Sequence, residues 1–337
     1  MKTNSLIAIA VTSLLFSNNL TTRAQLTSFA EGDKYGLKNA AGEVVVKPKY
    51  DDISDFYGGM ARVDIQEKYG YIDTTGNEVI PLKYADAGVF SEGLVEVEMN
   101  NKYGFIDKTG KMVIPFKYVT AEPFKQGLSF VRLAKPTVKD KDNVNGGFIN
   151  KSGKTVIPFI YNGGGHNFSE GLAMVATDND NILKCGYVDT TGKVVIELKY
   201  ELGGDFHEGL VSVESNGKRG FIDKSGMVVI DFKYDIKNVG ARFSEGLAGI
   251  MDGGKYGFID KKGNTIVPFI YEFASDFSEG LAAVQLDDKW GYIDTTGKIV
   301  IPCRYSKGWI FKNGKASVKL NDTDDFFNID KQGNPVK

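Results

Sequence analysis

The sequence predicts an all-β fold built from tandem repeats of about 34 residues, each contributing three short strands. A phrase of the form Lys-aromatic-Gly-aromatic-Ile-Asp-x-x-Gly recurs nine times, and its clearest copy runs from Lys289 to Gly297. No helical pattern with caps interrupts the repeats. Repetition at such a period is typical of solenoids, propellers and arrays. We expect the units to stack as an open β-solenoid, with a closed β-propeller as the alternative.

The spacing of the phrase favours the solenoid. The steps between successive central glycines are 34, 34, 43, 39, 34, 37 and 34 residues. These glycines are Gly36, Gly70, Gly104, Gly147, Gly186, Gly220, Gly257 and Gly291, and a ninth copy at residues 328–333 lacks the glycine. Propeller blades usually have four strands and about 40–50 residues. A shorter unit with variable steps suits an open stack better.

Each unit contains three expected strands joined by defined turns. In the clearest unit the strands are residues 281–286, 290–293 and 298–301. Asp294 is suited to accept hydrogen bonds from the turn backbone, and Gly297 to take the left-handed conformation that closes a hairpin. A tyrosine and then a Phe-x-x-Gly block follow in most units, as at Tyr305 and Phe311. Because an isolated hairpin is marginal in water, each unit must bury its faces on its neighbours.

These blocks resemble those of the bacterial WG-repeat, or KWG-repeat, proteins. The resemblance rests on the phrase itself, on the I-P-x-K-Y element and on F-S-E-G-L, and it covers roughly residues 29 to 333. Tryptophan occupies the namesake position only at Trp290, whereas Tyr69, Tyr103 and Tyr256 replace it elsewhere. The resemblance implies a β-rich repeat fold with a binding role. It implies no catalytic residues.

The N-terminus has the pattern of a secretory signal peptide. Lys2 supplies a positive charge, Leu6–Phe16 is an apolar core, and Thr22 and Ala24 are the small residues before a cleavage site at Gln25. We therefore expect a signal peptide at residues 1–24 and a repeat domain at residues 25–337, with about nine units of which the first and last are incomplete. Export to the periplasm or the medium follows, and an uncleaved or interfacial segment is the alternative.

Composition and motifs favour no catalytic chemistry. The net charge is −2 and the pI is about 5.9, which is not the charge balance of a nucleic-acid-binding protein. No catalytic triad or phosphate loop is present, so we expect neither an enzyme nor a cofactor. His166 and His207 occupy similar places in successive units and are weak metal candidates. A metal site needs three or four convergent ligands.

Two charged positions also recur, the lysine of the phrase and the glutamate of F-S-E-G-L. In a stack of repeats, each set forms a line. Lines of opposite charge side by side favour a salt-bridge ladder, which contributes roughly 0–1 kcal/mol for each exposed pair. The alternative is a row of lysines that grips a polyanion.

The repeat period breaks in three places, at residues 133–146, 162–167 and 177–184. Insertions in repeat proteins often lie on the binding face, although neutral drift in tolerant loops is the alternative. The candidate binding residues are Lys135, Lys139, Lys141, His166, Asp178 and Asp180, together with Trp309, an aromatic outside the phrase. We expect an exported binding or scaffold protein that engages another protein or a cell-surface polymer. The alternative is a carbohydrate-binding protein that uses exposed aromatic residues.

Overall fold

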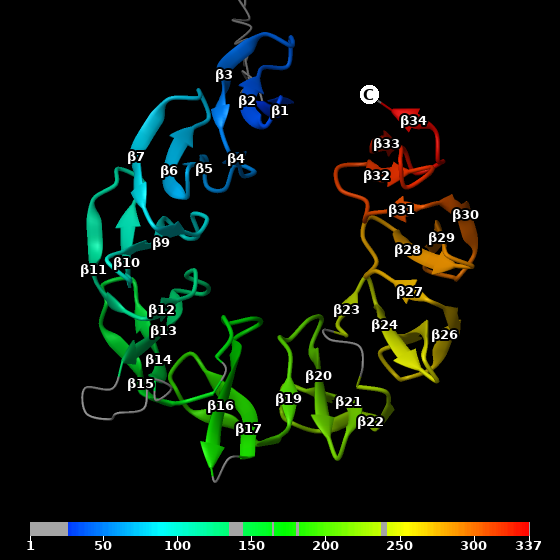
Figure 1. Ribbon diagram of the computed structural model, residues 1–337. Coiled ribbons are helices and arrows are strands. Elements are labelled where there is room, and N and C mark those ends of the chain that lie inside the picture. The colour runs from blue at the N-terminus through cyan, green and yellow to red at the C-terminus, as the bar shows by residue number, and fades with distance from the viewer. Residues whose placement is uncertain (1–25, 135–143, 164, 180–181, 237–240, 337) are drawn as a thin grey trace, which may run out of the picture.

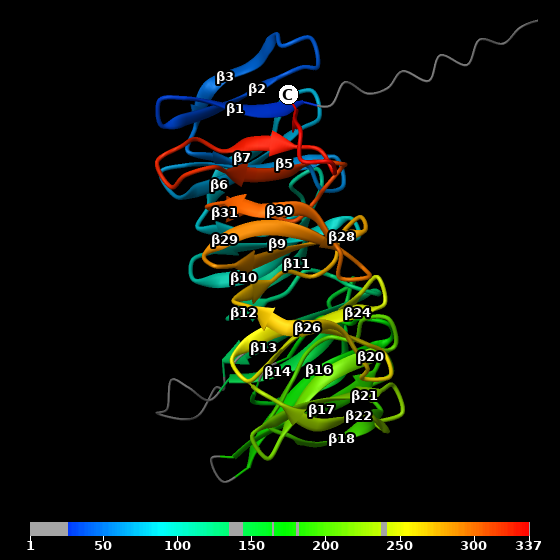
Figure 2. The ribbon, with the colours of Figure 1, turned by 90° about the vertical axis from the view of Figure 1, so that its right-hand side faces the viewer.

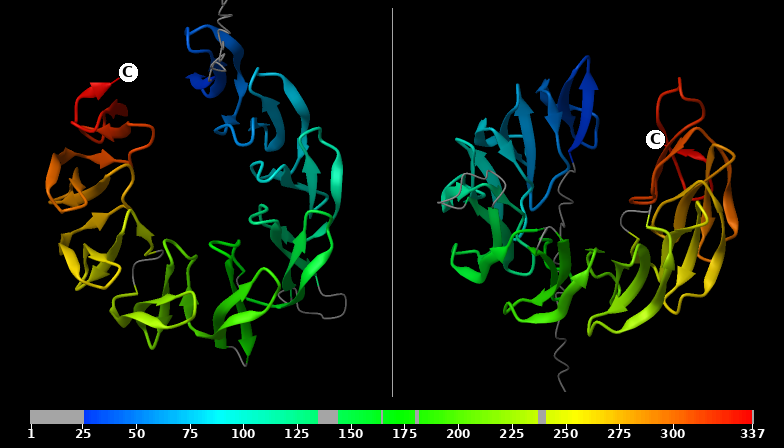
Figure 3. Two further views of the ribbon diagram at one scale, coloured as in Figure 1. Left: turned by 180° about the vertical axis from the view of Figure 1, so that it is seen from behind. Right: turned by 60° about the horizontal axis from the view of Figure 1, so that its bottom comes forward.

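The chain folds as a ring of small sheets, seen here in a computed structural model. The structure describes residues 26–134, 144–163, 165–179, 182–236 and 241–336, and these residues form nine antiparallel sheets and no helix. The sheets follow one another around a ring as the blades of a β-propeller (Figures 1 and 3). The all-β prediction is confirmed, and the open solenoid is wrong.

The first four blades use strands β1 to β15. Blade 1 contains β1 (Thr27–Glu31), β2 (Lys34–Lys38) and β3 (Val44–Tyr50). Blade 2 contains β4 (Asp52–Ile53), β5 (Met60–Ile65), β6 (Lys68–Asp73) and β7 (Glu78–Tyr84). Blade 3 contains β8 (Asp86–Ala87), β9 (Leu94–Met99), β10 (Lys102–Asp107) and β11 (Met112–Tyr118). Blade 4 contains β12 (Thr120–Ala121), β13 (Leu128–Ala134), β14 (Val144–Asn150) and β15 (Thr155–Tyr161).

The other five blades use strands β16 to β34. Blade 5 contains β16 (Leu172–Asn179), β17 (Ile182–Asp189) and β18 (Val194–Tyr200). Blade 6 contains β19 (Leu202–Gly203), β20 (Leu210–Ser215), β21 (Lys218–Asp223) and β22 (Val228–Tyr234). Blade 7 contains β23 (Phe243–Ser244), β24 (Leu247–Asp252), β25 (Lys255–Asp260) and β26 (Thr265–Tyr271). Blade 8 contains β27 (Phe273–Ala274), β28 (Leu281–Leu286), β29 (Lys289–Asp294) and β30 (Ile299–Tyr305). Blade 9 contains β31 (Lys307–Gly308), β32 (Ala316–Lys319), β33 (Phe327–Ile329) and β34 (Pro335–Val336).

A very short extra strand explains why 34 residues suffice for a blade. Seven blades have four strands, and the strand missing from the sequence prediction is only two residues long. These short strands lie toward the inside of the ring, as β27 and β31 do, whereas β26 and β30 lie on its outer side (Figure 1). The period breaks fall between strands, around β14 and β16, and the three long strands of blades 4 and 5 are all present. The variable period therefore does not distinguish an open stack from a ring of blades.

The recurring phrase performs the structural role predicted for it. Its glycine lies at a register shift between the second and third long strands, for example between Trp290 and Tyr292. A Cβ atom on Gly291 would lie only 2.6 Å from the carbonyl oxygen of Ile301. In the turn that follows, Asp294 Oδ1 accepts hydrogen bonds from the N–H groups of residues 296 and 298, at 2.9 and 3.1 Å. Gly297 closes this turn with a φ of 84°.

Apolar clusters join each blade to the next. Eight clusters of buried side chains occupy the eight junctions from blade 1 to blade 9. At seven of them the second aromatic residue of the phrase meets the phenylalanine of the next blade's Phe-x-x-Gly turn, with ring centroids 4.8–5.1 Å apart. Tyr292 and Phe311 are one such pair. Burying each ring contributes roughly 1.5–3 kcal/mol, so each blade depends on both neighbours.

The Phe-Ser-Glu-Gly turns add a polar link, which we call the turn clamp. The serine hydroxyl donates to the carbonyl of the next blade's turn phenylalanine, as Ser278 does to Phe311 at 2.8 Å. The glutamate accepts from the glycine N–H of the next turn, as Glu279 does from Gly314 at 2.9 Å. It also pairs with a lysine of the next blade, Lys331 in this case. The same ion pair joins Glu92 to Lys151, Glu170 to Lys224 and Glu208 to Lys261.

The expected ladder of charges thus exists with different lysines. The glutamates pair with lysines that directly follow the turn aspartate or asparagine, not with the lysine that opens the phrase. Opening lysines instead pair with an acidic residue 17 positions later, as Lys255 does with Glu272 at 2.7 Å. The two sets are separate because they lie at opposite ends of the second long strand.

The ring is completed without a shared blade. β1–β3 and β31–β34 are separate sheets, so neither terminus adds a strand to the other's blade. Among the described residues, no apolar cluster joins blade 9 to blade 1; Asn328 replaces the aromatic residue on blade 9, and Lys38 replaces a buried isoleucine on blade 1. An ion pair of 2.9 Å between Lys312 and Asp55 links blade 9 to blade 2 across this joint. Figure 2 shows β1 and the C-terminus at the same end of the particle.

Replacing Gly291 with alanine should lower the free energy of unfolding by roughly 1–3 kcal/mol, because the new methyl group overlaps the Ile301 carbonyl. Gly204→Ala is the matched control, since the nearest atom to its Cβ lies 3.9 Å away. Urea unfolding monitored by circular dichroism measures both. Equal destabilisation by the two variants would contradict the role given to this glycine.

Stability should fall as the pH drops below about 4.5. Burial pulls the pKa of Glu92, Glu170 and Glu208 upward, but their lysine and backbone N–H partners outweigh it and hold the pKa below its ordinary value. The stabilisation by these carboxylates is therefore fully present above their pKa in the unfolded chain. It is lost as the pH falls through their lower pKa in the folded protein. Melting temperatures from pH 7 to pH 3 measure the loss.

The matched variant carries glutamine at all three positions. Gln126 already accepts the Gly171 N–H in one natural clamp, so this variant keeps the hydrogen bond and loses the ion pair. At pH 7 its free energy of unfolding should be lower by roughly 0–1 kcal/mol for each partly exposed pair, so it should melt at a lower temperature. Its melting temperature should also depend less on pH. A pH profile identical to that of the native chain would rule out the clamps as its origin.

Candidate functional site

Part of the predicted binding face lies outside the described residues, namely Lys135, Lys139, Lys141 and Asp180. Asp178 is described and exposed at the end of β16. Its N–H donates to Asn162 Oδ1 at 2.6 Å, a contact that ties the segment after β15 to β16. Asp178 belongs to blade 5, whereas Trp309 belongs to blade 9.

The two histidines do not converge on a metal site. His166 Nδ1 lies 2.8 Å from Asp205 Oδ1 of the next blade, and this hydrogen bond raises the pKa of His166 against the opposing effect of burial. His207 takes the serine position of its turn. Across the part of the chain that the structure describes, no three His, Cys, Asp or Glu side chains are placed to hold a metal ion.

Trp309 is 62% exposed and lies in a groove on blades 7 to 9. The groove has a volume of about 1170 Å³, and its aromatic wall also contains Tyr256, Phe273 and Trp290. The ring centroid of Phe273 lies 5.5 Å from that of Tyr256 and 5.2 Å from that of Trp290. We call the part of the groove lined by Tyr256, Phe273, Trp290 and Trp309 the aromatic groove. These residues come from three consecutive blades.

Local structure holds the aromatic residues in place. Tyr256 and Trp290 are the first aromatic residues of their phrases, on β25 and β29. Phe273 lies on the short strand β27, in register with Gln285. The backbone of Trp309 is fixed at both ends, because its N–H donates to Ser317 at 3.0 Å and its carbonyl accepts from the Tyr292 hydroxyl at 2.8 Å.

Small residues on the inner long strand accompany the groove. The position opposite the second aromatic residue of the phrase holds Phe130 in blade 4 and Met174 in blade 5, and both side chains are buried. In blades 7 and 8 the same position holds Gly249 and Ala283. Gly249 lines the groove. The absence of a large side chain there leaves space beside the aromatic wall.

Polar side chains border the aromatic groove. Arg242 Nε lies 2.6 Å from Asp276 Oδ2, so this pair bridges blades 7 and 8 at the edge of the groove. His207 and Lys307 add further polar groups. An apolar, largely aromatic surface with a few convergent polar groups is typical of a binding site.

Sequence reasoning identified Trp309 but not its partners. Tyr256 and Trp290 stand at the first aromatic position of the repeated phrase; Tyr256 belongs to the buried core and Trp290 packs against a core cluster. Phe273 lies outside the repeated motifs and is 43% exposed. The available signal was the pair of small residues at positions 249 and 283. That signal becomes visible once the blades are aligned on the position opposite the second aromatic residue.

Comparison with solved structures supports the propeller fold. A eukaryotic initiation factor is similar with a TM-score of 0.61 and 12% identity over 93% of this chain and 95% of that chain. AztD from Citrobacter koseri, in its apo form, has a TM-score of 0.46 and 12% identity over 93% of both chains. BamB from Moraxella catarrhalis has a TM-score of 0.42 and 15% identity over 80% of this chain and 95% of that one. At 12% identity the likeness to the initiation factor concerns the fold alone, and the fold argument rests on that structure.

A search of curated proteins found no match. Among the described residues, no helix is long and apolar enough to span a membrane. The WG containing repeat matches eight times, at residues 35–69, 69–103, 103–135, 147–179, 186–218, 220–256, 256–290 and 290–323. These matches cover most of the sequence and confirm the resemblance that its motifs indicated. The chain belongs to the family of WG-repeat proteins.

Proposed function

We propose that this chain is an exported, non-enzymatic binding protein that holds part of another protein or of a cell-envelope polymer in its aromatic groove. The observation that supports this proposal best is the exposure of Trp309 and Phe273 beside a groove. Exposed apolar patches of this kind mark interaction sites more often than chance. Aromatic side chains also supply much of the binding energy at protein interfaces.

The scaffold supports such a role because the wall of the groove is rigid. Phe311, two residues from Trp309, is fully buried against Tyr292 of the preceding blade. The turn clamps tie blades 7, 8 and 9 in sequence. A ligand that lies across three blades therefore meets a preformed surface and loses little affinity to ordering the protein.

A carbohydrate ligand is the second candidate. Sugar rings stack on flat aromatic faces, and their hydroxyl groups need polar partners close by. Trp309 and Phe273 supply exposed rings, and Asp276 and Arg242 supply polar groups at the edge. A protein ligand instead uses the groove as a pocket for an apolar side chain.

The insertion residues remain a separate prediction. Asp178 and His166 belong to the blade 5 region, whereas the aromatic groove spans blades 7 to 9. A ligand in the groove therefore does not need Asp178. Substitutions at the two places should affect different ligands if both places bind.

Trp309→Ala should weaken binding to the ligand by roughly 5- to 30-fold, since the largest exposed ring of the groove is lost. Gly249→Met should have a similar effect by filling the groove with a side chain that Met174 already places in blade 5. The probes are a glycan array and immobilised envelope proteins, each tested with the purified chain. Array binding identifies a carbohydrate, and capture of one envelope protein identifies a protein ligand.

Phe326→Ala is the control for these variants. Phe326 is an exposed aromatic residue of blade 9 that does not line the groove, so its loss should leave binding unchanged. Binding that survives both Trp309→Ala and Gly249→Met, with melting temperatures unchanged, would exclude the groove as the site.

Export predicts a mature chain that begins at Gln25. The full sequence expressed in a bacterial host should be recovered outside the cytoplasm, and intact-mass measurement should show the loss of residues 1–24. A variant with Ala24→Asp should remain uncleaved, because the position before the cleavage site requires a small residue. Recovery of the native chain at full length in the cytoplasm would rule out export.

A further inference from the structure

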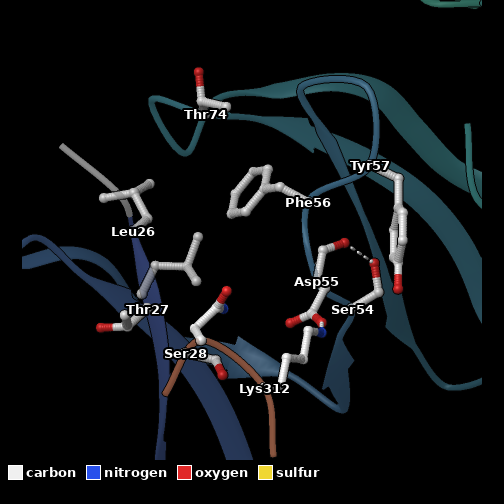
Figure 4. A pocket seen from close by; sticks show the side chains of 11 residues that line it. Leu26, Thr27, Ser28, Ser54, Asp55, Phe56, Tyr57, Thr74 and Lys312 are labelled. Atoms are coloured by element: carbon white, nitrogen blue, oxygen red, sulfur yellow. Dashed lines mark hydrogen bonds and ion pairs between the residues drawn. The ribbon is translucent and has the colours of Figure 1, made fainter. Parts of the chain in front are cut away.

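The junction between blades 2 and 3 has no turn clamp. The turn of blade 2 reads Phe-Tyr-Gly-Gly at residues 56–59, so neither the serine nor the glutamate of a clamp is present. At each junction from blade 3 to blade 9, the glycine N–H of the following turn donates to a side chain of the preceding turn. The Gly93 N–H of blade 3 has no such acceptor on blade 2. Phe56 lines a cavity of about 610 Å³ beside Leu26, with Tyr57 on the other side of the turn (Figure 4).

Blade 3 carries an acidic residue at a position where the other blades have none. Glu96 lies opposite Phe105, the second aromatic residue of its phrase. The same position holds Phe130 in blade 4, Met174 in blade 5 and Ala283 in blade 8. A carboxyl group therefore stands where the repeat elsewhere places apolar or small side chains.

The carboxyl group of Glu96 is buried without a partner. Only 8% of Glu96 is exposed, and within the described part of the chain its Oε2 accepts no hydrogen bond. The group lies against Gly88, where a Cβ atom would be 1.7 Å from Oε1. Because a charge buried without a partner is costly, this place favours the neutral, protonated carboxyl.

The groups around Glu96 do not compensate for a negative charge. Charged and titratable side chains pack around it from blade 2 (Tyr71 and Arg62), from blade 3 (Asp86, Glu98 and Tyr103) and from blade 4 (Glu122). The Arg62 guanidinium donates to the Ala87 carbonyl at 2.9 Å and lies 5.3 Å from the Tyr69 ring centroid. Burial, together with two neighbouring carboxylates, raises the pKa of Glu96 to about 8. The carboxyl group therefore keeps its proton at neutral pH.

The segment that Glu96 lies against connects blade 3 to blade 2. The Tyr71 hydroxyl donates to the Gly88 carbonyl at 2.9 Å, and Arg62 donates to the Ala87 carbonyl. The Gly88 N–H donates to the backbone carbonyl of Glu96, at 3.0 Å. Since the carboxyl group lies against Gly88, its departure toward water displaces the segment on which both contacts from blade 2 depend.

We propose that Glu96 is a proton-controlled latch of the junction between blades 2 and 3. With its proton in place, the carboxyl group stays buried and the two blades remain in contact. Without the proton, the carboxylate moves to water, residues 87–88 leave their hydrogen bonds, and the junction opens. No clamp ties the two turns, so the aromatic pair of Tyr71 and Phe90 and the bond from Lys108 to the blade 2 turn are left to hold the blades. This latch is independent of a ligand in the aromatic groove and of export.

The direction of the pH dependence follows from the raised pKa. An exposed glutamate has a pKa of about 4.5, so below that pH both the closed and the open form carry the proton. Between about pH 4.5 and about pH 8 the closed form binds the proton more tightly, and opening becomes easier by up to about tenfold for each pH unit. Above about pH 8 both forms are ionised, and opening no longer depends on this group.

Hydrogen exchange of the native chain, measured from about pH 5 to about pH 9, tests the latch. After correction for the intrinsic exchange rate, the opening constant of residues 86–99 should rise by up to about tenfold for each pH unit and level off above about pH 8. Residues 281–294 of blade 8, where Ala283 stands at the position of Glu96, are the internal control and should show no such rise.

Glu96→Gln keeps the shape of the protonated side chain and has no proton to lose. The opening constant of this variant should therefore not change with pH. Glu96→Met copies Met174 of blade 5 and should behave alike, which keeps the test decisive if the glutamine variant does not fold. Glu98→Gln is the matched control, since it removes a neighbouring carboxyl group and should keep the pH dependence.

Tyr57→Ser combined with Gly58→Glu rebuilds the missing clamp. Gly58 has a φ of 59°, close to the 51° of Glu92, and the position of its Cβ lies 3.4 Å from Lys108 Nζ. The rebuilt clamp should lower the opening constant roughly 3- to 10-fold at each pH and leave the pH dependence in place. A rise with pH that persists in both Glu96 variants, or its absence from the native chain, would overturn the proposal. An opening constant unchanged by the rebuilt clamp would also overturn it, because the opening would then lie elsewhere.

Discussion

The structure depends on one contact, the aromatic pair that joins each blade to the next. A single blade is a sheet of three or four short strands, which is marginal in water when it stands alone. The second aromatic residue of the phrase and the phenylalanine of the following turn remove both faces of the blade from solvent, as Tyr292 and Phe311 do. The turn clamps lie on the same turns, so burial and polar pairing fix the same neighbour. The stability of the protein therefore comes from the contacts between neighbouring blades and not from any single blade.

The elements that repeat strictly were predictable from the sequence. The glycine of the phrase, the aspartate turn and the long strands follow from local rules that recur in every unit, and Asp294 and Gly297 behave as those rules require. The short inner strand was missed because two residues such as Phe273–Ala274 have no detectable periodicity. The choice between ring and solenoid depends on the angle between neighbouring blades. That angle is set by side-chain packing at the junction, which a one-dimensional pattern does not record.

The candidate site was predictable only in part, for a similar reason. Trp309 drew attention because it lies outside the repeated phrase. Trp290 and Tyr256 keep their places in the phrase and still pack against the core, although they also line the groove. Whether a residue at a repeated position is covered depends on what faces it. Gly249 and Ala283 stand where Phe130 and Met174 fill the space in blades 4 and 5. In a repeat protein, a loss of volume at one position can leave a groove beside residues that keep their repeated places, as Gly249 does beside Tyr256.

The aromatic groove and the joint of the ring share one loop. Trp309 lines the groove and Lys312 crosses the joint to Asp55, yet only two residues separate them. Between them Phe311 is buried against Tyr292, and its carbonyl accepts the Ser278 hydroxyl at 2.8 Å. Moving this loop as a unit would require breaking the aromatic pair and the turn clamp of blades 8 and 9 together. Phe311 therefore separates the two places mechanically, so that a ligand on Trp309 does not have to displace Lys312.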